Sequence, residues 1–559
     1  MKQPLLSPVL SSSFLPHAKR SPFSALPFVG RATELEALRT ATADDMHKLL
    51  LIEGEPGIGK TRLAEMFISS SGALGLTGRV RELEKSLPYQ PLIEALRTLP
   101  GHPDWPARQA EIRAHLSAVW MAETARLLPE LIPPGAEAYP PSPADESRLW
   151  EGVYQFLVAL SRQRHVILFL DDLHWADAST LALLGYFVHR RQIDAPNAPI
   201  TFLAATQPPA LRSPLAALLQ SLTREGRLHR LSLARLPPDA LTSLAKNLSP
   251  GYAHPLATWL AQNSEGNPYI LSELVRYARE NGILLNDGAV NLTVLSASPT
   301  VPQTVYALIQ SRLARLSDGA RRVLDAAVAV GREFDFEVVA RAAALSETAA
   351  LDALDELRAA GLIAPLAAGD LRYAFDHSLT MEVAYREVGE PRHRLLHRRV
   401  AEAMEIVYRS RIDSVAGPLA SHFSEGNAPE RAAPHALRAA RQAAALAAWK
   451  EAIAFYEQAL AGVSDDERGP IHAALGSVRM QAGILRVRPR AFARRWRWPS
   501  LARPAPAKYA RRWDRRSSHR PDTRKRSPWR RIYSPKDRPA APRAPGCCGA
   551  LLCRSRGLT

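Results

Sequence analysis

The sequence predicts an α/β core with a parallel sheet and helices on both faces, followed by mainly helical domains. Two observations carry this prediction. Short apolar runs alternate with helical stretches between Phe28 and about Leu236, and alanine-rich helical patterns occupy the chain from about Val415 to Gln481. Alternation of strands and helices is typical of parallel sheets, because each crossover places a helix on a sheet face.

Three apolar runs are the expected strands, and each ends in residues suited to chemistry. Leu49–Ile52 runs into a glycine-rich turn, Val166–Leu170 ends in two aspartates, and Ile200–Ala205 ends at Thr206. Runs this short, without alternating polar residues, are typical of strands buried on both faces. The carboxyl ends of such strands meet at one edge of the sheet.

The rest of the body is expected to be mainly helical. Residues 237 to about 282 have a helical pattern with a break at Gly266–Pro268. Short helices and then an extended stretch at Leu371–Phe375 indicate a winged-helix-like unit. Two small-residue patterns at helical spacing indicate tetratricopeptide-like repeats. These patterns comprise Ala436, Ala440, Ala443 and Ala447, then Ala452, Tyr456, Ala459 and Leu460.

These patterns predict six segments along the chain. They are a flexible leader (1–27), an α/β core (28–236), a helical lid (237–295), a winged-helix-like domain (296–403), incomplete tetratricopeptide-like repeats (404–485) and a basic tail (486–559).

Charge is distributed unevenly between body and tail. The tail holds 23 of the 72 Lys and Arg residues and 3 of the 55 Asp and Glu residues, a net charge of +20. The other 485 residues hold 49 basic and 52 acidic residues, so their net charge is −3 within a total of +17. All three cysteines also lie in the tail, so the body has no disulfide and no Cys-ligated metal site.

Two interpretations of the tail are open. Arginine clusters with interleaved tryptophans, such as residues 494–498, could bind nucleic acid. Alternatively, the abrupt change at about Leu485 inside an unfinished helical repeat is what an out-of-frame translation of GC-rich DNA would produce. Ten prolines in its 74 residues leave little room for long helices, so we expect it to be disordered.

No apolar run approaches the roughly 18 residues that a membrane helix needs. The leader also lacks the order of charge and apolar residues of a signal peptide. We therefore expect a cytoplasmic protein with no membrane contact.

The glycine-rich turn after the first strand matches the G-x-x-x-x-G-K-[ST] pattern of a P-loop. It consists of Gly54, Glu55, Pro56, Gly57, Ile58, Gly59, Lys60 and Thr61, and Arg62 continues into a helix. The glycines let backbone N–H groups surround phosphates, and the following helix adds its positive N-terminal end. Lys60 is expected to bind the β- and γ-phosphates, and the Thr61 hydroxyl to coordinate Mg²⁺. The predicted ligand is ATP or ADP with Mg²⁺.

Asp171 and Asp172 follow the second strand, 111 residues after Lys60. Carboxylates in this position can reach the P-loop magnesium and a water near the γ-phosphate. We assign Asp171 to the magnesium shell and Asp172 to polarising the water, although the two roles could be exchanged. The structural alternative for Asp172 is a helix N-cap.

Three further positions have a functional and a structural interpretation. Thr206 could sense the γ-phosphate or simply end a strand. The break at Gly266–Pro268 could belong to the site or only interrupt a helix. His377, after the expected hairpin strand, could be functional or an ordinary packed or surface residue.

Four segments together resemble the predicted STAND-class ATPases, which are AAA-like modules of large bacterial regulators. The segments are Phe28–Arg31 with Glu34 and Leu35, the P-loop, Leu170–Asp177, and Glu265–Tyr269. Such modules accompany LuxR-type or SARP-type DNA-binding domains or nucleotide cyclase domains, and they carry tetratricopeptide repeats. The resemblance covers about Phe28 to Leu485 and implies a P-loop NTPase core followed by lid, winged helix and repeats.

The resemblance also implies roles for single residues. Val29, Gly30 and Arg31 would lie near the adenine, and Pro268 would be the lid proline that touches the base or ribose. His377 would approach the β-phosphate of bound ADP. One position departs from the family pattern, because Gln207 and Pro208 follow Thr206 where an aromatic residue and an arginine are usual.

The favoured function is a regulatory switch that controls signalling or transcription. The ADP state would hold core, lid and winged helix closed, and exchange to ATP would open them and permit self-association. ATP hydrolysis would be slow and would reset the switch, with Lys60 and Asp172 as the catalytic residues. An inducer or a protein partner is expected on the helical repeats.

Two alternative functions are open. One is a DNA-binding transcription factor that acts through the basic tail or the winged helix. The other is a truncated relative whose regulatory output is absent, since no output domain is recognisable in the sequence.

Overall fold

The computed structural model describes nine stretches of the chain. They are residues 26–44, 48–80, 87–102, 104–131, 145–194, 198–285, 287–297, 305–366 and 371–484. The chain divides into two units, residues 1–486 and 487–559, and the helices and strands below all belong to the first. Most of the predicted leader, and the whole of the basic tail, lie outside the described residues.

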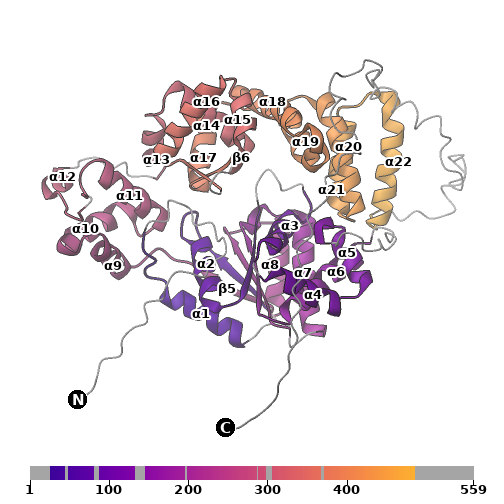
Figure 1. Ribbon diagram of the computed structural model, residues 1–559, viewed down its shortest axis with the longest axis horizontal. Coiled ribbons are helices and arrows are strands. Elements are labelled where there is room, and N and C mark those ends of the chain that lie inside the picture. The colour runs from indigo at the N-terminus through magenta and orange to yellow at the C-terminus, as the bar shows by residue number, and fades with distance from the viewer. Residues whose placement is uncertain are drawn as a thin grey trace, which may run out of the picture. The chain divides into compact units, whose positions relative to one another are not determined.

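A five-stranded parallel sheet forms the core of the N-terminal part (Figure 1). Its order is β2-β3-β4-β1-β5, and every neighbouring pair is parallel. The strands are β1 (Leu49–Glu53), β2 (Leu74–Arg79), β3 (Val166–Asp171), β4 (Ile200–Thr206) and β5 (Leu228–Ser232). Every residue of β1, β3 and β4 is buried, which confirms the three strands predicted from apolar runs.

Helices cover both faces of this sheet, as predicted. They are α1 (Ala32–Asp44), α2 (Lys60–Ser71), α3 (Gln90–Arg97), α4 (Trp105–His115), α5 (Ala118–Ala125), α6 (Glu146–Ser161), α7 (Ala178–Asp194) and α8 (Pro214–Arg224). Alternate strand residues enter two separate hydrophobic clusters: Leu50 packs with Leu63 and Phe67 of α2, whereas Leu168 packs with Phe156 of α6. This two-sided burial explains the continuous apolar runs in the sequence.

Two strands were not predicted, and both lie at the sheet edges. β2 contains Gly75 and Gly78, which interrupt its apolar pattern. Both glycines are needed for close approach, because a Cβ on Gly78 would lie 1.7 Å from the carbonyl oxygen of Pro91 in α3 and one on Gly75 would lie 2.5 Å from Ile68 in α2. β5 pairs only with β1 and has no buried residue, so its sequence carries no apolar run.

Four helices follow the core and enclose a hydrophobic cluster of their own. They are α9 (Pro238–Leu248), α10 (Ala253–Ser264), α11 (Pro268–Glu280) and α12 (Leu292–Ala297). The helix break predicted at Gly266–Pro268 is the turn between α10 and α11. Glu265 (φ 48°) and Gly266 (φ 80°) adopt left-handed conformations there, and Pro268 starts α11 at a position where proline is well tolerated.

The next domain has the expected winged-helix-like composition of helices and a small antiparallel sheet. The helices are α13 (Val305–Leu313), α14 (Asp318–Val330), α15 (Phe336–Ala342), α16 (Glu347–Ala359) and α17 (Ser378–Glu387). The strands β6 (Glu333–Asp335), β7 (Ile363–Pro365) and β8 (Arg372–Phe375) pair in the order β6-β8-β7. The extended stretch predicted at Leu371–Phe375 is therefore confirmed as β8.

The C-terminal described part is all helical. Its helices are α18 (Glu390–Val407), α19 (Ala416–Glu425), α20 (Pro429–Ala445), α21 (Trp449–Leu460) and α22 (Asp465–Gln481). The two predicted small-residue patterns face each other between α20 and α21, where Ala436, Ala440, Ala452 and Ala459 are fully buried. Alanine side chains allow the two helices to approach closely, as repeat packing requires.

The helices in the described ranges do not include one with the length and hydropathy needed to cross a membrane. The six segment boundaries given above stay predictions, although the gap between β5 and α9 spans the expected end of the core at residue 236.

The close approach of β2 to α3 generates a first prediction. We expect Gly78→Ala to lower the free energy of unfolding by about 1–3 kcal/mol, because the new methyl group meets backbone that cannot move aside freely. Gly101→Ala is the matched control, since nothing lies within 4 Å of a Cβ at that position. Denaturant unfolding of the two variants compares them, and equal stabilities would contradict the packing seen between β2 and α3.

Candidate functional site

The P-loop connects β1 to α2 and takes the conformation that its glycines permit. Gly57 (φ 75°) and Gly59 (φ 94°) have left-handed backbones, which a side chain would strain. Gly59 is the N-cap of α2, which begins at Lys60, so the helix N-terminus opens into the loop. Its first N–H groups and the helix dipole favour an anion there. The predicted strand–loop–helix context is confirmed.

Lys60 is held against the loop that precedes it. Its ammonium donates hydrogen bonds to the carbonyl oxygens of Gly54 and Glu55, both at 3.0 Å. Burial lowers the pKa of Lys60, and the nearby carboxylates of Asp172 and Asp171 raise it in part. The charged end of Lys60 therefore lies at the loop and near both aspartates, where the phosphates of a nucleotide would bind.

Thr61 and Asp171 meet at the end of β3. The Thr61 hydroxyl donates a 2.8 Å hydrogen bond to Asp171 Oδ2, and Asp171 is fully buried. A hydroxyl and a carboxylate oxygen in contact are a donor set that suits Mg²⁺, which commonly takes one or two protein oxygens and completes its octahedron with phosphate and water. The residues present therefore fit the predicted cofactor, and Thr61 and Asp171 are the residues that would hold it.

Asp172 lies beside this pair but faces another cation. Its backbone is left-handed (φ 55°), a conformation that costs energy for a non-glycine residue and is frequent at functional sites. Burial raises the pKa of Asp172 to about 6, with a further contribution from Asp171. Asp172 Oδ2 forms an ion pair at 3.7 Å with Arg332, which belongs to the winged-helix-like domain.

Arg79 and Arg332 are site residues that the sequence did not reveal. Arg79 ends β2, and its guanidinium lies 3.9 Å from Asp171 and 3.6 Å from Glu65. Recognition of β2 as a strand would have placed Arg79 at the carboxyl edge of the sheet. Arg332 follows Gly331 between α14 and β6, and no local pattern distinguishes it from other arginines.

Thr206 lies at the end of β4, as predicted, and it is fully buried. Its carbonyl oxygen accepts from Gly54 N at 3.3 Å, so it is adjacent to the start of the P-loop. Its hydroxyl donates to the carbonyl oxygen of Gln207 at 2.8 Å. The structure brings Thr206 to the site, and its role as a phosphate sensor stays a prediction.

The turn before α11 touches the P-loop directly. Asn267 caps α11 by accepting from Tyr269 N at 3.0 Å, and its side-chain amide donates to Pro56 O at 3.3 Å. Tyr269 N also donates to Gly57 O at 3.2 Å. A Cβ on Gly59 would lie 3.9 Å from the Pro268 ring. The predicted lid proline is thus beside the loop, and its contact with a base or ribose stays a prediction.

The ring of His377, in the winged-helix-like domain, packs against the same tyrosine at a tilt of 32°. The ring centroids of His377 and Tyr269 are 4.0 Å apart, and His377 Nδ1 caps α17 by accepting from Leu379 N at 3.1 Å. Burial, together with the charges of Arg332 and Lys60, lowers the pKa of His377 to about 3. His377 is therefore neutral and lies near the cations of the site. Its approach to a β-phosphate stays a prediction.

The segment Val29–Arg31 contacts both the P-loop and the lid. Arg31 is 5% exposed and donates to Ala234 O at 2.7 Å and Ile58 O at 3.3 Å. A Cβ on Gly30 would lie 2.3 Å from the Ala240 Cβ, and Val29 packs against the lid cluster. Arg31 thus has protein partners for its guanidinium, and contact of this segment with adenine stays a prediction.

Arg62, the remaining predicted contact residue, lies in the first turn of α2. Its guanidinium donates to Leu26 O and lies over the Phe28 ring, 5.9 Å from its centroid. The structure therefore ties Arg62 to the segment that precedes α1, on the same side of the P-loop as Val29.

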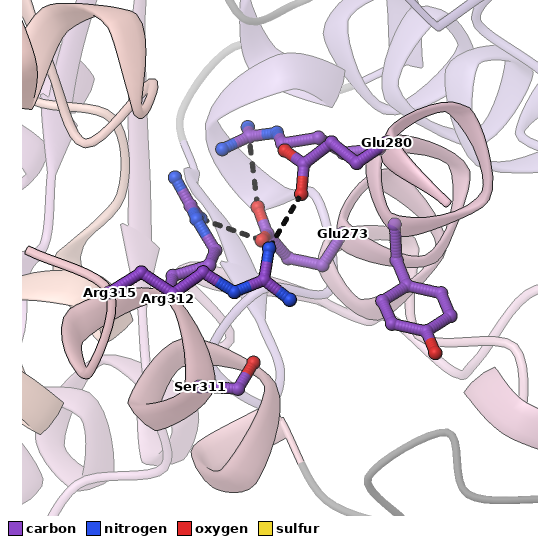
Figure 2. A pocket seen from close by; sticks show the side chains of 7 residues that line it. Glu273, Glu280, Ser311, Arg312 and Arg315 are labelled. Carbon is purple, nitrogen blue, oxygen red and sulfur yellow. Dashed lines mark hydrogen bonds and ion pairs between the residues drawn. The ribbon is translucent and has the colours of Figure 1, made fainter. Parts of the chain in front are cut away.

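A group of ion pairs connects α11 to the winged-helix-like domain. Figure 2 shows Glu273 of α11 between two arginines, with Arg315 directed to Glu280. Arg312 Nη1 lies 2.7 Å from Glu273, and Arg276 lies 3.3 Å from it. The same two arginines lie 4.0 Å from Asp376, the residue before His377. Because Glu273 is 2% exposed, its pairing is needed to offset burial of its charge.

Polar contacts connect the helical repeats to the core. Glu451 of α21 accepts from Ser179 N at 3.2 Å and from Ser179 Oγ at 2.6 Å, at the N-terminus of α7. This end of α7 lies eight residues beyond Asp171, and Asp177 next to it is 4% exposed. Burial and then the charge of Glu451 raise the pKa of Asp177 to about 7. The repeats therefore contact the segment that directly follows the paired aspartates.

These features define a class of protein. A parallel sheet, a P-loop at a helix N-terminus, and paired aspartates at the end of β3, which lies two strands from β1 in the sheet, together make a P-loop NTPase; one of these aspartates is bonded to Thr61. Residues 27–203 match the family described as the AAA ATPase domain, about a third of the chain. Residues 27–203 therefore form an AAA ATPase domain, as the motifs predicted, and this family implies nucleotide binding.

Proteins similar to the chain include a curated relative and several solved structures. An uncharacterised protein of Rhizobium meliloti (strain 1021) is 25% identical over 317 residues, which are 54% of this chain and 28% of that protein. A STAND protein with a tetratricopeptide repeat sensor from Pyrococcus horikoshii is 16% identical, with a TM-score of 0.42, over 82% of this chain and 63% of its own. A Walker-type ATPase of Pyrococcus abyssi is 14% identical, with a TM-score of 0.34, over 65% of this chain and 99% of its own.

The chain thus spans little more than a quarter of the length of this curated relative and less than two thirds of the STAND structure. At these identities and TM-scores, the comparisons transfer no activity or partner to the chain.

The contact of Asn267 with the P-loop generates a second prediction. We expect Asn267→Ala to weaken ATP binding several-fold, because both the cap of α11 and the bond to Pro56 O are lost, each worth about 1 kcal/mol. Ser213→Ala removes a similar cap, from α8, which makes no such bond to the loop. Calorimetric titration with ATP and Mg²⁺ compares them, and equal affinities would mean that the lid contact does not support the loop.

The buried carboxylate of Asp177 generates a third prediction, on pH. Its pKa in the folded state, about 7, is above its ordinary value of 3.8, so its stabilising contribution is complete below pH 4 and is lost as the pH rises through 7. Asp177→Asn keeps a capping oxygen but cannot ionise. We therefore expect its stability, relative to the unsubstituted protein, to increase between pH 5 and pH 8.

Denaturant unfolding at the two pH values measures this difference, with Asp355→Asn as the control because Asp355 is 72% exposed on α16. A relative stability of Asp177→Asn that is independent of pH would refute the assignment.

Proposed function

We propose that the chain is an ATP-binding regulatory switch of the STAND type, in which exchange between ADP and ATP controls signalling or transcription. In this proposal the ADP state holds core, lid and winged-helix-like domain together, and the ATP state releases them and permits self-association. Slow hydrolysis of ATP to ADP and phosphate resets the switch. Lys60 binds the phosphates, Thr61 and Asp171 hold Mg²⁺, and Asp172 orients the attacking water.

The observation that carries the proposal is that two domains outside the core contact the nucleotide loop or its aspartates. The lid bonds to Pro56 and Gly57, and Arg332 of the winged-helix-like domain pairs with Asp172. A ligand that changes its contacts in this loop therefore acts on both domains at once. Such differential contact is the physical requirement for a ligand-driven change of conformation.

The chain also supplies a route from the site to the repeats. Helix α11 bonds to the loop at its N-terminus and pairs with Arg312 of α13 farther along, so it links the nucleotide to the winged-helix-like domain. Glu451 of α21 bonds to the start of α7, close in sequence to the paired aspartates. An inducer or protein partner that binds the repeats would thereby alter the same site, as the proposed switch requires.

Slow hydrolysis is part of the proposal for two reasons. Gln207 and Pro208 stand after β4 where related ATPases carry an arginine. In addition, the carboxylate proposed to orient water, Asp172, is paired with a guanidinium. An enzyme built for turnover would keep both positions ready for the terminal phosphate.

Nucleotide titration with a matched pair of lysine variants tests the proposal. We expect the unsubstituted chain to bind ADP and ATP with Mg²⁺, and Lys60→Ala to weaken both about 10- to 100-fold, since charge-assisted bonds to phosphate are lost. Lys246→Ala is the control, because Lys246 is an exposed residue on α9.

The switch also requires that the two nucleotides give different oligomeric states by light scattering. The proposal fails if the purified chain binds neither nucleotide, or if Lys60→Ala binds as well as the control.

A further inference from the structure

Arg332 carries a charge from the winged-helix-like domain to the aspartates of the core. Its backbone is fixed in its own domain, where its carbonyl oxygen accepts from Phe375 N of β8 at 2.9 Å. Its guanidinium lies 3.7 Å from Asp172 Oδ2, and the two side chains are 24% and 25% exposed. The pair is therefore largely withdrawn from water, where a charge–charge attraction is stronger than at the surface.

The other cations at this edge belong to the core and face other partners. Lys60 bonds to loop carbonyl oxygens, and Arg79 lies within 4 Å of both Asp171 and Glu65. Asp171 in turn accepts from Thr61. Of the two aspartates, Asp172 is thus the one that forms an ion pair with a second domain, through Arg332.

A diphosphate and a triphosphate differ in what they require of Asp172. A diphosphate would have no terminal phosphate for Asp172 to act on, and its magnesium would be held by Thr61 and Asp171. A triphosphate would bring a terminal phosphate and an attacking water, and Asp172 is the carboxylate proposed to orient that water. A carboxylate oxygen that lies 3.7 Å from a guanidinium is attracted to that cation, and this attraction competes with its interaction with such a water.

We propose that Arg332 makes the site prefer a nucleoside diphosphate to a triphosphate, because its ion pair with Asp172 must break before that carboxylate can act at a terminal phosphate. The inference rests on the proposed function and names the residue that sets its resting state. Part of the binding free energy of the triphosphate is used to break the ion pair between Arg332 and Asp172. Removal of this ion pair should therefore increase the affinity for the triphosphate relative to the diphosphate.

The experiment compares affinities for Mg²⁺ with ADP and Mg²⁺ with a non-hydrolysable ATP analogue by calorimetry on the full chain. For Arg332→Met we expect the ratio of triphosphate to diphosphate affinity to rise about fivefold or more. Arg332→Lys, which keeps the charge, should retain a ratio close to that of the unsubstituted chain. Arg341→Met is the matched control, because Arg341 lies on the same domain and pairs with Glu337 of its own helix at 2.9 Å.

A double-substitution cycle separates the ion pair from other effects of the arginine. In an Asp172→Asn background, Arg332→Met should change the affinity ratio no further, because the partner carboxylate is already absent. If Arg332→Met does not fold, as judged by its unfolding transition, Arg332→Gln gives the same comparison with a polar side chain.

Two results would overturn the inference. An unchanged ratio would mean that the pair is only structural, and a ratio that falls would mean that Arg332 binds the terminal phosphate itself. Neither result contradicts the proposed function, provided that the chain binds both nucleotides and that Lys60→Ala weakens this binding. Failure of the unsubstituted chain to bind either nucleotide would instead remove the proposed function.

Discussion

Asp171 ends β3, in which every residue is buried, and Asp172 directly follows with a side chain that is only 25% exposed, so each carboxylate needs a partner close by. The core meets the first need with the hydroxyl of Thr61, and the second partner, Arg332, comes from another domain. This unequal pairing makes the site dependent on the winged-helix-like domain. A buried charge without its partner is costly, so the position of that domain and the state of the site are linked.

Helix α11 is the second constraint on the arrangement. Its first turn bonds to the P-loop, and Glu273 farther along pairs with Arg312 and Arg276 in a group of ion pairs that leads to Asp376 and His377. One rigid helix therefore contacts both the nucleotide loop and the neighbouring domain. A shift at the loop of even a fraction of an ångström has to be absorbed by these packed contacts, which favours discrete alternative arrangements over gradual change.

The helical repeats and the core share one hydrophobic cluster, which contains residues of the sheet and of the alanine-rich helices, so the two parts stabilise each other. Within that cluster, Glu451 places a carboxylate at the N-terminus of α7, where the helix dipole and Ser179 stabilise it. Asp177 lies nearby, and its pKa is raised first by its own burial and then by the charge of Glu451. A sensor surface joined to the site through polar contacts can be released more readily than one joined by apolar packing alone.

The sequence alone determined the central strands, the P-loop and the small-residue faces of α20 and α21. In each case the signal is local: uninterrupted apolar runs, glycines at spacing that phosphate requires, or alanines one turn apart. It could not reveal β2, because the glycines that allow α2 and α3 to approach also remove its apolar pattern. Nor could it reveal Arg332 or Glu451, whose partners lie 160 and 272 residues away. Long-range pairing of charges leaves no periodicity in a sequence, so only the tertiary structure decided which arginine and which glutamate reach the nucleotide edge.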